Sequence, residues 1–205
     1  AQNQAAKNGR RDSSYEFGTN PCSEIILRPY QFCNLTEVVI RSTDTEQDLE
    51  RKIAVATILG TLQATYTKFP YLRQVWQDNT DEERLLGVSL TGIMDNPLTT
   101  TANPELPALL ERLRAVSVEV NKEWAGKLGI AVSTAITAVK PSGTVSQLVN
   151  SASGIHARHS EYYIRTVRGA FNDPLTQFMK DQGIPWEPCA HQPDTTVVFS
   201  FPQKS

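Results

Sequence analysis

Three residues that could do chemistry stand at alternate positions near the start of the chain. Asn20, Cys22 and Glu24 lie in the stretch NPCSE. In an extended backbone, side chains two residues apart point to the same side, so an amide, a thiol and a carboxylate would face one substrate. The carboxylate could take a proton, the amide could orient an oxygen, and the sulfur could donate or abstract hydrogen. The alternative is structural, because buried thiols are usually inert and Asn-Pro commonly starts a turn.

A second thiol, Cys33, follows eleven residues after Cys22, which is too far for a CxxC motif. If the two segments run antiparallel around a loop near Pro29, Cys33 could approach Cys22 and serve as an electron donor. The alternative is that Cys33 is a small apolar filler before Leu35.

A glycine-bearing segment lies much further along the chain. The run TAITAVKPSGTVSQLV predicts a strand, a tight loop and a helix, in which Gly143 would allow close approach of a ligand. Hydroxyls at Ser142, Thr144 and Ser146, together with free N–H groups at the helix start, favour an anion such as phosphate. The order of residues differs from a P-loop. The alternative is that Ser142 or Thr144 caps its own helix.

Composition excludes several classes of protein. The chain has 205 residues, with 20 Lys+Arg against 22 Asp+Glu and a net charge of -2, so it lacks the basic excess of a nucleic-acid-binding protein. No apolar stretch reaches the roughly 20 residues that a membrane span needs. Three cysteines are few, and their number is odd, which argues against the disulfide framework of a secreted protein. We therefore expect a cytoplasmic protein without a nucleic-acid or membrane partner.

The elements that must position these residues alternate along the chain, which predicts the α/β class. Extended segments are expected within 20–41 and near 88–93, 134–139, 162–167 and 195–201. Helices are expected over about 44–66, 104–129, 142–151 and 173–183. Thr43 and Glu46 fit a capping box. The helix before Gly129 carries an apolar stripe made of Leu106, Leu110, Leu113, Val116, Val120 and Trp124.

Two other functions are compatible with these residues. Cys22 and His156 are 134 residues apart, a spacing found in papain-like cysteine hydrolases. The flanking PCSEI lacks the signature of those enzymes, and Glu24 would disfavour a thiolate. A non-catalytic phosphate-binding α/β module would need only the glycine-bearing segment.

Taken together, NPCSEI, CNL and KPSGTVSQLVNSASGIHARHSEYYIRTVR resemble the catalytic subunit of ribonucleotide reductases. The resemblance is greatest to the adenosylcobalamin-dependent class and its ribonucleoside-triphosphate reductases, and it extends from about Asn20 to the end. It implies reduction of ribonucleotides to 2'-deoxyribonucleotides by thiyl-radical chemistry, with adenosylcobalamin as cofactor at contacts that the sequence does not identify. The alternative within the family is the oxygen-dependent class. Tyr162 and Tyr163 follow the glycine-bearing segment too closely to be the radical tyrosines of that class.

The resemblance also implies a role for each matched residue. Cys22 matches the cysteine that becomes a thiyl radical and removes the 3'-hydrogen of the ribose, Glu24 the carboxylate that takes the 3'-hydroxyl proton, and Asn20 the amide that binds the sugar hydroxyls. Cys33 matches one of two cysteines that reduce the substrate. Its partner in the family lies upstream, where this chain has no cysteine. The substrate phosphates are expected at Pro141, Ser142, Gly143, Thr144, Val145 and Ser146.

The family fold is a ten-stranded α/β barrel with the catalytic cysteine on a central finger loop. We expect residues 1–19 to be a polar N-terminal segment of a truncated chain, and residues 20–205 to be the C-terminal portion of the barrel. Such a fragment should not turn over alone. The partners that the resemblance implies are a ribonucleotide substrate and a thioredoxin-type dithiol reductant.

Overall fold

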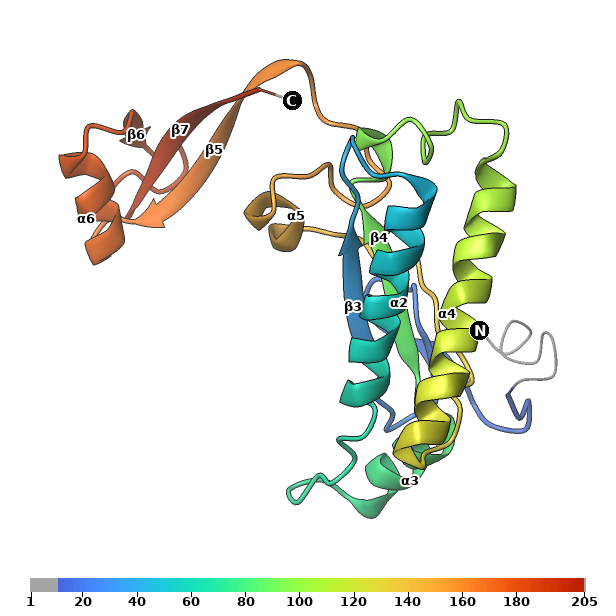
Figure 1. The fold of residues 1–205 in the computed structure, drawn as a ribbon. Helices are drawn as coiled ribbons and strands as arrows, with labels where there is room; N and C mark the ends of the chain where they lie inside the picture. Colours follow the sequence, from blue (N-terminus) through green and yellow to red (C-terminus); the bar gives the residue numbers. More distant parts are fainter. Residues whose placement is uncertain (1–10, 205) are drawn as a thin grey trace. The chain divides into compact units, whose positions relative to one another are not determined.

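The computed structural model describes residues 11–204. The chain divides into two compact units, one that ends at Ala157 and one from Arg158 onward, and each is described by itself. The elements of the first unit (Figure 1) are β1 (Gly18–Thr19), β2 (Ile26–Leu27), β3 (Asn34–Val39), α2 (Glu46–Gln63), α3 (Gln74–Glu83), β4 (Leu86–Thr91), the 3-10 turn η2 (Ile93–Asp95), α4 (Leu106–Leu128) and α5 (Thr144–Leu148).

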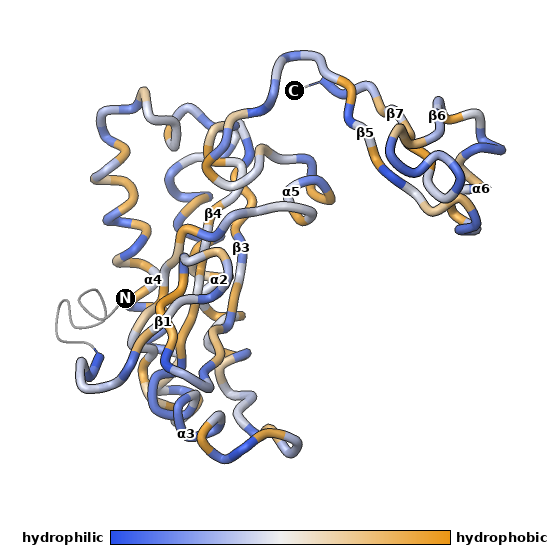
Figure 2. Tube along the Cα trace, turned by 180° about the vertical axis from the view of Figure 1, so that it is seen from behind, coloured by the Kyte–Doolittle hydropathy of each residue, from blue (hydrophilic) through white to orange (hydrophobic). Residues whose placement is uncertain are grey.

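A parallel strand pair with helices on one face forms the centre of the first unit, so the predicted α/β class is confirmed. β3 and β4 run parallel, with Asn34 opposite Leu86 and Val39 opposite Thr91. Parallel neighbours need a crossover connection, which α2 and α3 provide. Figure 1 shows α2 and α4 along the same face of this pair, and Figure 2 shows the hydrophobic residues concentrated there. The core includes Val38, Ile40, Leu49, Ile53, Leu86, Val88, Leu109, Leu113 and Ile136.

The helix α2 begins two residues later than the capping box predicted. Thr45 is the N-cap, its hydroxyl accepts from the backbone N–H of Asp48, and the Asp48 carboxylate accepts from the N–H of Thr45 at 3.1 Å. The prediction of Thr43 and Glu46 is therefore wrong. Thr43 is instead part of the turn that follows β3, in which the backbone N–H of Asp44 donates to Arg41 O at 3.0 Å.

The helix α4 has the expected length and ends at Gly129, whose φ of +65° closes the helix as predicted. Of the predicted apolar stripe, Leu113 is buried and Val116 packs against the core, whereas Leu110 is 43% exposed and Leu109 is buried instead. Polar residues share the buried face. The Asn121 amide donates to the hydroxyls of Thr61 and Ser133, each at 3.0 Å. These hydrogen bonds let α4 bury a face consisting of Leu109, Leu113, Ser117, Asn121 and Ala125.

The strand predicted over 134–139 is reduced to a single bridge between Thr137 and Val88. The segment still runs beside β4, because the backbone N–H groups of Leu86 and Val88 donate to Ala135 O and Ile136 O at 2.9 and 2.8 Å. The loop that follows this segment therefore begins at the same end of β4 as it would after a full strand.

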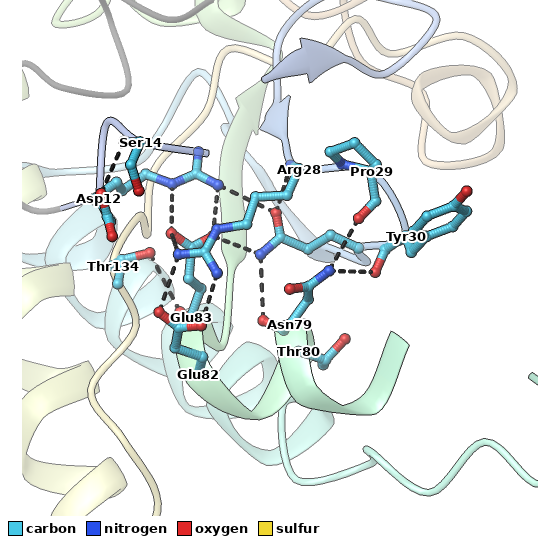
Figure 3. A network of polar contacts seen from close by, with 12 residues as sticks. Asp12, Ser14, Arg28, Pro29, Tyr30, Asn79, Thr80, Glu82, Glu83 and Thr134 are labelled. Carbon is cyan, nitrogen blue, oxygen red and sulfur yellow. Dashed lines mark hydrogen bonds and ion pairs between the residues drawn. The ribbon is translucent and has the colours of Figure 1, made fainter. Parts of the chain in front are cut away.

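A buried carboxylate, Glu83 at the end of α3, ties the segments on either side of the N-terminal hairpin to this helix (Figure 3). Its side chain is 1% exposed and forms ion pairs with Arg11 at 2.6 Å and Arg28 at 3.1 Å. Gln31 adds a hydrogen bond. Burial alone would raise the pKa of Glu83, but Arg11, Gln31 and Arg28 more than offset it and leave this pKa below its usual value. Glu83 therefore contributes stability above the ordinary glutamate pKa and loses it as the pH falls through the lowered value.

Replacing Glu83 with glutamine should lower the free energy of unfolding of the complete protein by about 3–5 kcal/mol, because the buried guanidinium of Arg11 loses its counter-charge and that of Arg28 keeps only the half-exposed Glu82. The matched control is Glu82→Gln. Glu82 also pairs with Arg28, at 2.7 Å, but its side chain is 52% exposed, so the loss should be at most about 1 kcal/mol. Denaturant unfolding measures both variants, and equal effects would contradict the special place of Glu83.

The second unit is a three-stranded antiparallel sheet with one helix. Its elements are β5 (Tyr162–Ala170), α6 (Pro174–Asp181), β6 (Trp186–Pro188) and β7 (Thr196–Lys204), and the strand order is β5-β7-β6. Asp173 caps α6 by accepting from the N–H of Leu175, so the predicted helix and both long strands are confirmed. None of the described helices in either unit combines the length and the hydropathy needed to cross a membrane.

Candidate active site

The stretch NPCSE forms the loop of a small β-hairpin between β1 and β2, which are antiparallel. The Asn20 side chain closes this loop by accepting from the N–H of Ile25 at 3.0 Å, and the N–H of Ser23 donates to Asn20 O at 2.9 Å. Ser23 has a φ of +63°. The extended conformation expected for these residues is therefore wrong, because the asparagine side chain and a left-handed residue turn the chain back on itself.

The turn leaves the thiol of Cys22 exposed to solvent and buries the carboxylate of Glu24. Cys22 is exposed, whereas the Glu24 side chain is 4% exposed and forms an ion pair with Lys140 Nζ at 3.1 Å. Burial alone would raise the pKa of Glu24, but the Asn20 amide and the Lys140 ammonium more than offset it and hold this pKa below its usual value. Neither carboxylate oxygen has a well-aligned hydrogen-bond donor among the described residues. Glu24 is thus an ionised, buried acceptor with capacity to take a proton.

Cys33 lies directly before β3 and is partly buried. The expected antiparallel arrangement around Pro29 does not form within the described residues, since β2 pairs with β1 and β3 pairs with β4. Burial, followed by the negative charge of Glu24, raises the pKa of Cys33 to about 12. The group therefore stays a thiol at neutral pH and carries a hydrogen that it can donate.

The glycine-bearing loop leads into α5, which spans only Thr144–Leu148 of the helix predicted over 142–151, and offers one buried hydroxyl without a partner. Ser142 is 7% exposed, and its Oγ has no hydrogen-bond partner within residues 11–204. Ser146 is fully buried, and its hydroxyl donates to Gly143 O at 2.7 Å. Space beside Gly143 is open, because a Cβ placed there would meet nothing within 4 Å. The loop can therefore admit a ligand at Ser142 and Gly143, while Ser146 secures its shape.

A strap formed by residues 151–154, which sequence reasoning missed, holds the loop against β4. The Thr91 hydroxyl donates to Ala152 O at 3.0 Å and accepts from the N–H of Gly154 at 2.9 Å, while Asp95 accepts from the N–H of Ala152 at 2.8 Å. Gly154 has a φ of +54°, and a Cβ on it would lie 3.5 Å from Lys140 O. Glycine is favoured here by its positive φ, since a Cβ at 3.5 Å would be an ordinary contact.

Sequence reasoning also missed Lys140 and Glu37, which connect the two candidate segments. Lys140 is the residue immediately before Pro141 and contacts Glu24. Glu37 on β3 lies within electrostatic range of Lys140, and its Oε1 is buried without a hydrogen-bond partner. The lysine directly before PSGT could have drawn attention to this position, but its carboxylate partner, Glu24, is distant in the sequence. These contacts bring the hairpin loop and the glycine-bearing loop to one place.

Comparison with known proteins connects this geometry to one family. The chain is 31% identical over 217 residues to the adenosylcobalamin-dependent ribonucleoside-triphosphate reductase of Lactobacillus gasseri, covering 92% of this chain and 28% of the relative. The Euglena gracilis protein of the same name is 30% identical, with 90% and 25% covered. A crystal structure of a B12-dependent (class II) ribonucleotide reductase matches with a TM-score of 0.75 and 27% identity, over 92% of this chain and 29% of that chain. The chain is a homologue of part of the class II ribonucleotide reductases.

The homology to class II reductases covers nearly all of this chain but only 28% of the first relative. No family model matches the chain. The structural match agrees with the mixed α/β fold of both units.

The other candidate residues have ordinary surroundings. His156 is exposed, and its backbone N–H donates to Ser153 O at 2.9 Å. Tyr162 and Tyr163 lie in β5, as their alternating setting predicted, where they pair with Lys204 and Gln203 of β7. The names of the relatives favour the class II reading over the oxygen-dependent class and over a hydrolase.

Proposed function

We propose that this chain supplies the radical cysteine, the proton-accepting carboxylate and the phosphate-binding loop of an adenosylcobalamin-dependent ribonucleoside-triphosphate reductase. The observation that carries the proposal is the 3.1 Å contact between Lys140 and Glu24, because it joins the two segments that the sequence assigned to ribose and phosphate. The homology to proteins of that name supports it. In the complete enzyme the chain forms the C-terminal portion, residues 20–205, of a ten-stranded barrel, with Cys22 on a central finger loop, and residues 1–19 precede it as a polar segment.

The ribose faces the hairpin loop in this proposal. Cys22, as a thiyl radical, removes the 3'-hydrogen, and its exposure leaves the sulfur open to the sugar. Glu24 accepts the 3'-hydroxyl proton, which requires the ionised carboxylate that Asn20 and Lys140 favour. Asn20 contacts the sugar hydroxyls. The 2'-hydroxyl then leaves as water, Cys33 and a second cysteine supply the two hydrogens that this reduction needs and become a disulfide, and Cys22 returns its hydrogen to the 3'-carbon.

The triphosphate occupies the loop from Pro141 to Ser146. Ser142 provides a buried hydroxyl without a partner and Gly143 provides open space. Thr144 and Val145 begin α5, so their backbone N–H groups lie at its first turn. Ser146 keeps the loop closed through Gly143 O.

Adenosylcobalamin, when bound, supplies the oxidising equivalent that makes the thiyl radical. The cobalt of this cofactor is held by its own corrin ring, and the described residues do not identify which side chains would contact the corrin, so we assign no cobalamin contact to this chain. The other partners are a ribonucleotide and a thioredoxin-type dithiol, and a cytoplasmic location without nucleic-acid or membrane partners remains a prediction.

Replacing Cys33 with serine in the complete enzyme should permit radical formation but block repeated turnover with a dithiol reductant, because serine can neither give the reducing hydrogen nor form the disulfide. The measurement compares deoxyribonucleotide formed per enzyme with the radical signal. The matched control is Cys189→Ser, a buried free cysteine of the second unit, which should turn over normally. Normal multiple turnover by the Cys33 variant would remove that residue from the mechanism. Activity without added adenosylcobalamin would contradict the proposed class.

A further inference from the structure

Lys140 belongs to the glycine-bearing loop by its backbone and to the hairpin loop by its side chain. Its backbone begins the glycine-bearing loop, two residues before Ser142, and its ammonium reaches the hairpin loop to meet Glu24 at 3.1 Å. The lysine side chain is 27% exposed and the glutamate 4%. A lysine at a phosphate loop would ordinarily turn toward phosphate, but this one is directed to a buried carboxylate.

The charged and titratable groups around the pair come from several elements. Cys22 of the hairpin loop and Glu37 of β3 act on Lys140, and Cys33 before β3 is affected by Glu24. The charge of Arg11 opposes Glu24 by lowering the pKa of Cys33. The contact with Glu24 raises the pKa of Lys140, burial lowers it by less, and the negative groups add to the rise. Lys140 is therefore the cation among Glu24, Glu37 and two thiols.

We propose that Lys140 is a positioning residue that keeps Glu24 ionised and directed at the ribose, and that links this carboxylate to occupancy of the phosphate loop. The inference rests on the proposed function and deepens it. The Ser153 hydroxyl of the strap donates to Ser142 O, so the strap holds the loop backbone two residues after Lys140. Phosphate bound at Ser142 and Gly143 then restrains the backbone of Lys140. The lysine side chain in turn restrains the carboxylate of Glu24.

The pH dependence follows from the two opposing influences on Glu24. Burial raises its pKa, whereas Asn20 and Lys140 lower it. When the ammonium is removed, burial is less fully offset and the pKa of Glu24 rises. The carboxylate must be ionised to accept a proton, so activity of the variant is lost at a higher pH than in the parent enzyme as the solution is acidified.

The experiment measures kcat and KM for a ribonucleoside triphosphate across pH in the complete enzyme carrying Lys140→Met. We expect kcat at neutral pH to fall by up to about 100-fold, as for a displaced catalytic group, with the acidic limb of its profile moved to higher pH and KM little changed. Lys140→Arg, which keeps the charge, should recover most of kcat and the parent profile. The matched control is Lys127→Met, whose lysine forms an exposed pair with Glu123 and should leave both constants unchanged.

A direct phosphate ligand would behave differently. A rise in KM with an unshifted pH profile would overturn the positioning role, as would an arginine variant as impaired as the methionine variant. A cycle with Glu24→Gln gives a second readout, since the double variant should be no slower than Glu24→Gln alone. Additive losses would contradict action through Glu24. Failure of the reductase proposal itself is recognised separately, because it would be seen as a parent enzyme without cobalamin-dependent activity.

Discussion

The complete enzyme with Cys22→Ala should form no deoxyribonucleotide, a loss of at least about 10⁴-fold, as when the reacting atom of an enzyme is removed. No other thiol among the described residues can replace it. Cys33 is partly buried and is needed for reduction of the substrate, and Cys189 is buried. Deoxyribonucleotide formation under reducing conditions is the measurement.

The Cys22 variant should remain folded, because the residue is exposed in a hairpin loop that Asn20 closes. Thermal unfolding should therefore match the parent within error. Cys189→Ala serves as the control for loss of a thiol, and it should retain activity. A folded Cys22→Ala enzyme with full turnover would end the radical assignment.

The second large effect is expected for Glu24→Gln, which should lower kcat by about 10²- to 10⁴-fold, the range for loss of a general base. Glutamine keeps the shape of the side chain but cannot accept the 3'-hydroxyl proton. It also removes the partner of Lys140, whose Nζ lies 3.1 Å from Glu24 Oε1. Steady-state kinetics with saturating triphosphate measures the change.

Two comparisons make the Glu24 result specific. Glu111→Gln changes a carboxylate that forms an exposed pair with Arg114 and should leave kcat unaltered. In the parent enzyme, acidification should reduce activity only below the ordinary glutamate range, because the pKa of Glu24 is held low. A Glu24→Gln enzyme within tenfold of the parent would show that another group takes the proton.

Much of the fold was predictable because its signals are local. The spacing of apolar residues predicted α4, and Gly129 predicted where it ends. Asp173 predicted where α6 starts. The misplaced features depend on contacts that the pattern of residue types does not show. Overlapping Thr43 and Thr45 signals both fit a capping box, and the turn after β3 decides between them. The polar face of α4 at Asn121 is buried only because Thr61 and Ser133 complete its hydrogen bonds.

The site was predictable by residue type but not by conformation. The sequence could place Asn20, Cys22 and Glu24 together, but an extended chain was the wrong reason, since Asn20 closes a turn. Lys140 escaped notice because its carboxylate partner is distant in the sequence and nothing local signals the contact. Residue roles in catalysis stay predictions, for which the resemblance provided the chemistry and the structure provides proximity.

The central claim is that the hairpin loop with Cys22 and the loop that begins at Lys140 serve one ribonucleotide. A crystal structure of the complete enzyme with a bound ribonucleoside triphosphate tests it most directly. We predict the ribose against Cys22 and Glu24, with the phosphates at Ser142 and Gly143. A nucleotide bound with its ribose away from Cys22, or with its phosphates on another segment, would contradict the account.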